Sequence, residues 1–319
     1  MFTEIFVVLG VIFLLSFLGY IIPQLIVCFS KPLDLKKRYG GGWAFITGGN
    51  SGIGEAFAKK AAKLGFNVAI LGQNEERLTK TATAISEINS QILIKTIVAD
   101  LSGDAVKVTE QIVHQLEGLD ISILYFNAGY GVMELASSPS EATLRQFRSN
   151  IVTHQYLFQE LYPKLAARKT DASRRGGVLF TASVGAFIYP PVMAVYGATK
   201  AYLGHLGECL ATEADSFGID VVSLYPGGTA TRFSDRITNV TMPKGIEKVS
   251  QSSDRVAGLA LSGLGRFTRV DCGAQGIGSR IVVKLIDANI FTRIMQKALP
   301  SLMKGMGFAA PKENEGKNE

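Results

Sequence analysis

The sequence contains few cysteines, and they are widely separated: Cys28, Cys209 and Cys272. An odd, scattered set offers neither a disulfide framework nor the spacing of a metal site, and it fits a reducing compartment. The histidines are equally few and share no ligand spacing: His114, His154 and His205. Each falls in a predicted helix, which is typical of ordinary surface or core histidines. We therefore expect no metal.

A basic stripe is also missing. Lysine and arginine exceed aspartate and glutamate by 33 to 27, for a net charge of +6, but they are scattered and not interleaved with aromatic residues. This pattern argues against a nucleic-acid partner. The 319 residues, 47% of them hydrophobic, suit one α/β domain with extensions.

Charge is absent from the whole run between Ile5 and Cys28. Its length matches the ~20 residues that a helix needs to cross the hydrocarbon layer. A buried globular helix would have a polar face, and this run has none. A cleaved signal peptide is the alternative, but Met1–Glu4 contains no basic residue and no A-x-A-like site follows. The sequence predicts a membrane anchor over residues 1–30.

The charges that flank this run predict its orientation. Glu4 precedes it, and a basic group follows it: Lys31, Lys36, Lys37 and Arg38. By the positive-inside rule, the chain after residue 30 lies in the cytosol. The linker, residues 31–42, would then face anionic headgroups, and the sequon at Asn239 would not be used.

Short apolar, β-rich runs alternate with amphipathic segments after the linker. The runs cover residues 43–47, 67–71, 93–99, 121–126, 177–182 and 220–225. Nearly continuous apolar runs are typical of parallel strands that are covered on both faces. The sequence therefore predicts a Rossmann-type, doubly wound α/β domain over residues 43–280, with helices on both faces of a parallel sheet.

Two later segments break this alternation. Residues 232–252 are polar and follow the last clear strand, so we expect them over the ligand crevice. Residues 281–310 predict an amphipathic helical extension, broken at Pro300, that packs on the domain or lies on a membrane surface. The polar tail, residues 311–319, predicts disorder.

A glycine-rich stretch, Gly48–Gly54, separates the first apolar run from the first amphipathic segment. Glycine permits a tight turn and a close approach to a pyrophosphate, and the following helix N-terminus supplies donors and a positive dipole end. The position between a buried strand and a helix is the context that such a motif requires. We expect a dinucleotide site here.

The pattern Thr47-Gly48-x-x-x-Gly52-Ile53-Gly54 resembles the fingerprint of the short-chain dehydrogenases/reductases, and further landmarks follow in the family's order from Tyr39 to Gly228. Phe126 replaces the first residue of one landmark, Asn-Asn-Ala-Gly. The resemblance implies a nicotinamide cofactor and a set of residues that contact it: Thr47, Gly48, Asn50, Ser51, Gly52, Ile53, Gly54, Gln73, Asp100, Leu101, Asn127, Ala128, Gly129, Tyr196, Lys200, Pro226, Gly227, Thr229 and Thr231.

The end of the second predicted strand bears on the choice of dinucleotide. An acidic residue there would bind a ribose 2′-hydroxyl, and a basic one a 2′-phosphate. This chain has Gly72 and Gln73, with Arg77 one helical step away. No carboxylate is present to repel the phosphate, which favours NADPH, with NADH as the alternative.

Tyr196 and Lys200 lie one helical turn apart, so they share a face. An ammonium group beside a phenol lowers the phenol pKa from about 10, which makes Tyr196 a usable acid or base near neutral pH. The family resemblance implies that Ser183, thirteen residues earlier, binds the substrate and steadies its carbonyl oxygen. It also implies that Asn150 orders a proton-relay water. The predicted catalytic set is Asn150, Ser183, Tyr196 and Lys200.

The N-terminal anchor, the stretch Leu35–Gly40, the stretch Asp100–Asp104 and the stretch Ser253–Ala260 resemble the branch of very-long-chain 3-ketoacyl-CoA reductases and 17β-hydroxysteroid dehydrogenases. That branch implies reduction of the 3-keto group of an acyl-CoA during fatty-acid elongation, by a single-pass protein of the endoplasmic reticulum membrane whose catalytic domain faces the cytosol. Alternative substrates are a 17β-hydroxysteroid, a retinoid or 3-ketodihydrosphingosine. A catalytically silent membrane scaffold is a further alternative. The resemblance also implies a possible homodimer through the helices that carry Asn150 and Tyr196.

Overall fold

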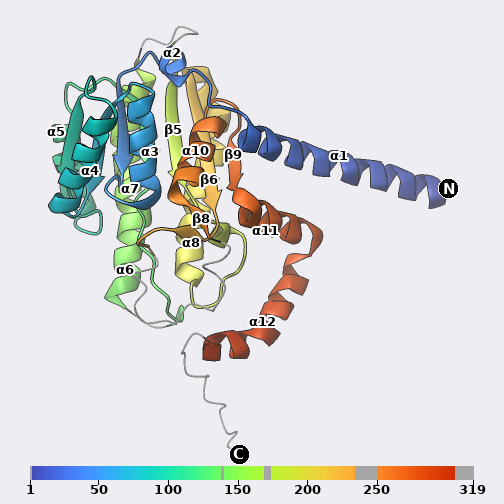
Figure 1. The fold of residues 1–319 in the computed structure, drawn as a ribbon. Coiled ribbons are helices and arrows are strands. Elements are labelled where there is room, and N and C mark those ends of the chain that lie inside the picture. Colours follow the sequence, from blue (N-terminus) through green and yellow to red (C-terminus); the bar gives the residue numbers. More distant parts are fainter. Residues whose placement is uncertain (1, 138–139, 169–173, 234–249, 306–319) are drawn as a thin grey trace, which may run out of the picture.

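A computed structural model describes residues 2–137, 140–168, 174–233 and 250–305 (Figure 1). These residues contain a seven-stranded parallel sheet with the order β3-β2-β1-β4-β5-β6-β9. Its strands are β1 (Trp43–Thr47), β2 (Asn67–Gly72), β3 (Ile94–Val98), β4 (Ile121–Phe126), β5 (Gly176–Thr181), β6 (Ile219–Pro226) and β9 (Arg269–Cys272). A short parallel pair joins β7 (Thr229–Ala230) to β8 (Gln251–Ser252).

Helices cover both faces of the sheet (Figure 1). One face is covered by α3 (Gly52–Lys63), α4 (Glu75–Ile88) and α10 (Ser253–Gly263), and the other by α5 (Ala105–Gln115), α7 (Thr153–Ala166) and α8 (Ala194–Ala214). The remaining helices are α1 (Phe2–Phe29), α2 (Leu35–Tyr39), α6 (Glu141–Phe147), α11 (Gly273–Leu285) and α12 (Ala288–Gly305), with the short turns η1 (Arg148–Val152), η2 (Val184–Ala186) and η3 (Asp215–Phe217).

Successive side chains of each strand point to opposite faces of the sheet and pack into two separate hydrophobic cores. On β1, Ala44 and Ile46 pack against α3 and α10, whereas Phe45 points into the core beneath α5 and α7. All three side chains are fully buried. Burial on both faces is the reason why the strands read as unbroken apolar runs, and the predicted doubly wound fold is confirmed.

The strand order reverses between β1 and β4. The chain leaves β1 into α3 on one face and leaves β4 toward α7 on the other. Such a switch point opens a crevice at the carboxyl ends of the strands, where ligands of doubly wound proteins bind. The glycine-rich turn after β1 lies at this crevice.

The sequence did not predict the strand β9. Its four residues, Arg269–Cys272, include two charged side chains and no apolar run. Both charges are neutralised by partners on other elements, because Arg269 pairs with Glu208 on α8 and Asp271 pairs with Arg280 on α11. No sequence pattern marks these pairings between different elements, so the seventh strand is visible only in the structure.

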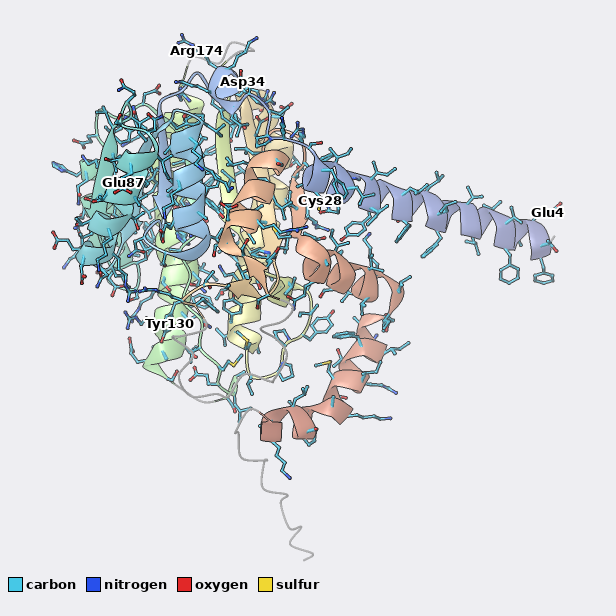
Figure 2. All side chains as sticks on the ribbon, in the orientation of Figure 1. Glu4, Cys28, Asp34, Glu87, Tyr130 and Arg174 are labelled. Carbon is cyan, nitrogen blue, oxygen red and sulfur yellow. The ribbon has the colours of Figure 1, made fainter. Side chains whose placement is uncertain are left out.

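The helix α1 is long and apolar enough to be a candidate membrane span. From Phe2 to Ser16 every residue is exposed, and Figure 2 shows side chains standing out from the helix along its length between Glu4 and Cys28. The last turns differ, because Gln24 and Val27 are buried against the domain. The segment predicted as an anchor, residues 1–30, therefore includes turns that pack on the domain.

Specific hydrogen bonds hold these last turns. Gln24 Oε1 accepts from the backbone N–H of Asp271 at 3.0 Å, and the Tyr20 hydroxyl donates to the Asp271 carboxylate at 3.0 Å. The Ser262 hydroxyl donates to the carbonyl of Ser30 at 3.0 Å. The helix is thus attached to β9 and α10 at a defined angle.

The carboxyl-terminal helices depart from prediction in one respect. The break expected at Pro300 is wrong, because α12 continues through it to Gly305, and the interruption instead separates α11 from α12. Met303 is 1% exposed, so packing of the last turn offsets the hydrogen bond that proline cannot donate. The helix α11 also runs across residue 280, the predicted domain boundary. Most of the predicted crevice segment 232–252, and the tail 311–319, lie outside the described residues.

The packing of α1 predicts different outcomes for two truncations. Removing residues 1–19 should leave the melting temperature of the domain nearly unchanged, since these residues contribute almost no burial. Removing residues 1–30 also deletes buried Val27 and the Gln24 hydrogen bond, which together contribute about 3 kcal/mol. We expect this to lower the melting temperature by roughly 6–12 °C. Thermal unfolding in detergent measures both, and equal melting temperatures would contradict the attachment.

Candidate active site

The turn after β1 requires glycine for steric reasons. Gly48 has φ 67° and Gly52 has φ 57°, a left-handed conformation that side chains disfavour. A Cβ at Gly48 would lie 2.9 Å from the Cα of Ala128, and one at Gly54 would lie 2.3 Å from the carbonyl oxygen of Gly48. The backbone therefore turns tightly into α3, whose N-terminus faces the crevice.

Thr47 fixes this turn to the end of β4. Its Oγ1 accepts from the backbone N–H groups of Asn127 at 2.9 Å and Ala128 at 3.0 Å. The Asn127 amide donates to the Thr47 carbonyl at 3.1 Å, and its oxygen accepts from Thr181 Oγ1 at 3.2 Å. Three strands are thereby tied together at the switch point, and the predicted residues Thr47, Asn127 and Ala128 are in contact.

A hollow of about 760 Å³ opens beside the turn. Asn50, Ser51, Gly52 and Thr231 of the predicted set line it, together with the basic side chains of Lys59, Arg77, Lys80 and Arg232. The Asn50 side chain covers Gly72, where a Cβ would lie 2.5 Å from the Asn50 Cγ. The end of β2 thus presents an amide and cationic groups to the hollow.

Gln73 and Asp100 bind to one another. Gln73 Nε2 donates to Asp100 Oδ1 at 2.6 Å, and the Ser102 hydroxyl and backbone N–H donate to the same oxygen at 2.6 and 2.8 Å. Partial burial raises the pKa of Asp100, but these hydrogen bonds lower it by more, so the pKa lies below its usual value. Asp100 is therefore a fixed, ionised acceptor, and Leu101 beneath it is buried in the core.

Lys200 is nearly buried, with 3% of its surface exposed, and its Nζ donates to the carbonyl of Thr181 at 2.8 Å. Burial lowers the pKa of Lys200 to about 8. A Cβ on Gly129 would lie 3.1 Å from this Nζ, so the glycine leaves room for the ammonium group. The predicted residues Gly129 and Lys200 are therefore neighbours.

The expected lowering of the Tyr196 pKa is wrong. Burial raises the pKa of Tyr196 to about 12, and a hydrogen bond with Ser183 opposes this only in part. The Lys200 ammonium lies 5.9 Å from the centre of the Tyr196 ring and is directed at a carbonyl instead. Desolvation of the phenol thus outweighs the attraction to the nearby charge.

Ser183 lies two residues beyond β5, at the start of η2. Its Oγ accepts from the backbone N–H of Gly185 at 3.1 Å, which leaves its proton for the Tyr196 oxygen. The structure thus brings the predicted Ser183, Tyr196 and Lys200 together at the carboxyl end of β5.

Asn150 is fully buried in the π-helical turn η1. Its side-chain oxygen accepts from the Tyr130 N–H at 2.8 Å, and its amide donates to the Tyr130 carbonyl at 2.8 Å and to Thr199 Oγ1 at 3.0 Å. These bonds link the loop after β4 to the helix that carries Tyr196. Single π-helical turns of this kind recur at functional sites.

His154 connects both halves of the site, a role that sequence reasoning did not assign. Its Nε2 lies 3.1 Å from Thr47 Oγ1, and its Nδ1 lies 3.3 Å from the Asn150 carbonyl. Because the Asn150 carbonyl can only accept, Nδ1 carries the ring proton, and Nε2 accepts from the Thr47 hydroxyl, which also lies 3.4 Å from the Tyr125 carbonyl. Burial, with the charge of Lys200, lowers the pKa of His154 to about 3, so the ring stays neutral.

The loop after β6 closes the remaining side. Thr229 Oγ1 donates to the carbonyl of Gly227 at 3.0 Å, and Thr231 Oγ1 accepts from the Phe233 N–H at 3.2 Å. Phe233 places its ring 5.4 Å from that of Tyr196. Pro226 ends β6 directly before this loop, and Gln275 accepts from the Gly228 N–H at 2.6 Å. Gln275 and Phe233 belong to the site although no local motif marks them.

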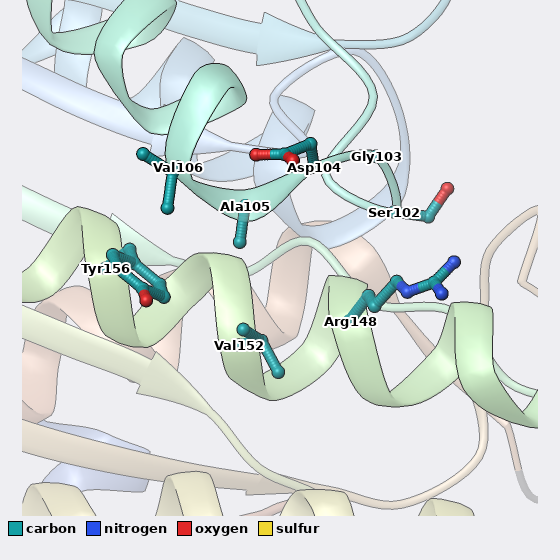
Figure 3. A pocket seen from close by; sticks show the side chains of 8 residues that line it. All are labelled: Ser102, Gly103, Asp104, Ala105, Val106, Arg148, Val152 and Tyr156. Carbon is teal, nitrogen blue, oxygen red and sulfur yellow. The ribbon is translucent and has the colours of Figure 1, made fainter.

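A second hollow, of about 520 Å³, lies between the start of α5 and the η1–α7 segment (Figure 3). Ser102, Asp104, Arg148 and Tyr156 are among its lining residues, and none of the predicted site residues lines it. Within the described part of the chain, no group of three His, Cys, Asp or Glu side chains could hold a metal ion.

Two curated proteins resemble the chain over most of its length. A very-long-chain 3-oxoacyl-CoA reductase of Caenorhabditis elegans is 28% identical, covering 91% of this chain and 89% of the relative. A 17-beta-hydroxysteroid dehydrogenase type 3 of Danio rerio is 31% identical, covering 72% of this chain and 76% of the relative.

Solved structures resemble the fold. A 7beta-hydroxysteroid dehydrogenase matches with a TM-score of 0.73 and 26% identity, covering 83% of this chain and all of that one. The 3-ketoacyl-(acyl-carrier-protein) reductase of Brucella melitensis, solved with NADH, matches with a TM-score of 0.61 and 25% identity, covering 74% and 93%. The family model described as short chain dehydrogenase matches residues 42–240, and the chain belongs to the short-chain dehydrogenase family.

Proposed function

We propose that this protein is a membrane-anchored, NADPH-dependent reductase of the 3-keto group of long-chain acyl-CoA. The observation that carries the reaction type is the Ser183–Tyr196–Lys200 cluster beside the glycine-rich turn. The substrate class is supported by similarity to the C. elegans 3-oxoacyl-CoA reductase across 91% of the chain.

The cluster assigns a role to each side chain. The substrate carbonyl oxygen accepts hydrogen bonds from the Ser183 and Tyr196 hydroxyls, which stabilise the negative charge that develops on it. A nicotinamide cofactor, when bound at the glycine-rich turn, would supply the hydride. Tyr196 donates its proton to the resulting oxygen, and Lys200, held by Thr181, stabilises the phenolate that remains.

Asn150 and His154 position these groups. Asn150 links the Tyr130 backbone to Thr199 on the catalytic helix, and neutral His154 ties Asn150 to Thr47 under the cofactor turn. A neutral ring adds no charge that would repel the Lys200 ammonium. The same hydrogen-bond network therefore positions both Tyr196 and the glycine-rich turn.

The preference for NADPH rests on the basic hollow. Within the described ranges, Lys59 and Lys80 are paired with Glu55 and Glu76, whereas Arg77 forms no ion pair. Arg77 lies in the first turn of α4, directly after the end of β2, which is where doubly wound proteins accommodate a 2′-phosphate, and a guanidinium matches phosphate in a bidentate fashion. Asn50 over Gly72 presents no carboxylate that would repel the phosphate.

An apolar anchor suits such a substrate. Each methylene of an acyl chain favours the bilayer by about 0.8 kcal/mol, so the enzyme meets its substrate at the membrane. The proposal places α1 across the endoplasmic reticulum membrane with the domain in the cytosol, as the flanking charges of Glu4 and Lys31 favour. A homodimer remains a prediction.

A steroid ketone is the second candidate substrate. Similarity to the 17-beta-hydroxysteroid dehydrogenase of Danio rerio, at 31% identity, supports it. A retinoid or 3-ketodihydrosphingosine remains an untested alternative. The silent-scaffold alternative is disfavoured, since Asn150, Ser183, Tyr196 and Lys200 are assembled in one network.

Turnover with graded substrates tests the function. Membranes that contain the protein should oxidise NADPH with 3-ketoacyl-CoA, faster for long chains than for short ones. Tyr196→Phe should reduce turnover by at least about a hundredfold, because it removes the general acid, while NADPH binding is retained. Consumption of a 17-ketosteroid with no consumption of any 3-ketoacyl-CoA would replace the proposed substrate by the second candidate.

The expected pH dependence of kcat/KM follows from the pKa values of Tyr196 and Lys200. Tyr196, with a pKa of about 12, keeps its proton throughout the neutral range, whereas Lys200 loses its charge near pH 8. For reduction, kcat/KM should be flat below pH 7 and fall about tenfold per pH unit above about 8, as the cation that stabilises the phenolate is lost. In Lys200→Arg, whatever activity remains should lack this fall. A wild-type rate that stays constant to pH 10 would contradict the role of Lys200.

Arg77→Ala should weaken NADPH selectively. Losing a charged hydrogen bond to phosphate should raise the KM for NADPH roughly ten- to hundredfold and leave the KM for NADH unchanged. Lys107→Ala, an exposed position on α5, serves as the matched control. Equal effects on the two cofactors would refute recognition of the 2′-phosphate by Arg77.

A further inference from the structure

We propose that the outward side of α11 and α12 lies on the surface of an anionic bilayer and that α1 holds it there. This juxtamembrane face consists of exposed apolar and basic side chains: Val282, Lys284, Leu285, Ile290, Arg293, Ile294, Lys297 and Lys304. The inference rests on the proposed membrane crossing by α1.

The exposure of α1 sets the level of the bilayer surface. Residues Phe2–Gly19 project away from the domain and, at 1.5 Å per residue, extend about 27 Å, close to the hydrocarbon thickness of ~30 Å. Contacts with the domain begin around Tyr20. The headgroup layer therefore lies at Tyr20, a residue type that favours this layer.

The helix α11 lies at that same level. The Tyr20 hydroxyl lies 3.0 Å from the Asp271 carboxylate and 3.4 Å from the carbonyl oxygen of Ile277 on α11. The Lys284 ammonium lies 5.3 Å from the centre of the Tyr20 ring. Gln24 also accepts a hydrogen bond from the Asp271 N–H. These contacts prevent free rotation of the domain about α1, so α11 stays at the headgroup layer.

The helix α12 continues from α11 on this side. In Figure 1, α1 leaves the domain beside β9 and α11. The helix α12 starts at the outer end of α11, its first part runs across the direction of α1, and its last part curves back below the domain. A helix placed across a membrane-spanning helix runs along the bilayer surface. Side chains of α12 differ in exposure: Met303 in the last turn is 1% exposed, whereas Ile290 and Ile294 are 57% and 51% exposed.

The charge of this face matches anionic headgroups. Ile290, Ile294 and Lys297 recur at helical spacing on one side of α12, with Arg293 next to them. Lys284 and Lys304 add two further exposed cations, and Asp287 is the one acidic residue between Asp271 and Lys304. Exposed apolar side chains among basic ones are typical of helices that lie in a membrane interface.

The inner sides of these helices contact the loop that follows Ser183. The Arg280 guanidinium lies 3.4 Å from the centre of the Phe187 ring, and the Phe291 ring lies 5.7 Å from that of Tyr189. The same elements thus face the bilayer outward and the substrate side of the catalytic cluster inward. A carbonyl compound dissolved in lipid would reach the site along this side.

Depth-dependent quenching tests the proposal in the full chain. Single cysteines at Ile290, Ile294, Leu14 and Val106 are placed in a Cys28→Ala/Cys209→Ala background and labelled with an environment-sensitive fluorophore. Buried Cys272 is left in place. The protein is reconstituted in phosphatidylcholine vesicles with or without phosphatidylserine, and quenching is measured by lipid nitroxides, placed either at the headgroup or in the middle of the acyl chain, and by aqueous iodide.

Probes at 290 and 294 should be quenched several-fold more by the headgroup nitroxide than the probe at 106, which is also exposed, at 46%, but lies on α5, on the far side of the domain. They should also be shielded from iodide. Phosphatidylserine should strengthen both effects. Arg293→Gln/Lys297→Gln should abolish that dependence, whereas Lys107→Gln should not.

Three outcomes would overturn the proposal. Probes at 290 and 294 that behave like the probe at 106 would show that this side faces water. Shielding from iodide without nitroxide quenching would mean that protein, such as a second copy of the chain, covers the face. A probe at Leu14 that lipid nitroxides do not quench would show instead that α1 is outside the bilayer, so failure of the anchor is distinguished from failure of this contact.

Discussion

The hydroxyl of Thr47 is the contact on which the rest of the site depends. It receives two backbone N–H groups from the end of β4 and directs its own proton to His154, which in turn reaches Asn150. One buried oxygen thereby fixes the cofactor turn relative to the catalytic helix. Buried polar networks are stable only when every member is satisfied, and each of these groups has its partner.

Burial controls the acid–base chemistry more than proximity of charge does. The same desolvation moves the phenol of Tyr196 and the ammonium of Lys200 in opposite directions, because each loses the stabilisation of its charged form. The phenol therefore holds its proton firmly until charge develops on the neighbouring oxygen. Lys200, whose pKa of about 8 is close to neutral pH, is the group whose charge changes with the pH of the solution.

Local patterns predicted much of this protein, since the first six strands, the glycine turn and the Tyr196–Lys200 spacing each depend on residues close in sequence. The remainder depends on partners that lie on other elements. The charges of β9 are neutralised by Glu208 on α8 and Arg280 on α11, and His154 gains its role from Thr47, more than a hundred residues away. The raised pKa of Tyr196 also required the structure, because burial cannot be read from a helical spacing.

The bond between Gln24 and Asp271 has a consequence for solubility. The strand β9 ends the sheet, and the unpaired N–H and C=O groups of an open edge invite strands from other molecules. The last turns of α1 pack against β9, where Gln24 accepts a hydrogen bond from the backbone N–H of Asp271 and so satisfies one of these edge donors. The apolar helix thus also protects β9 from pairing with strands of other molecules, and a chain without it would expose an open sheet edge that favours aggregation.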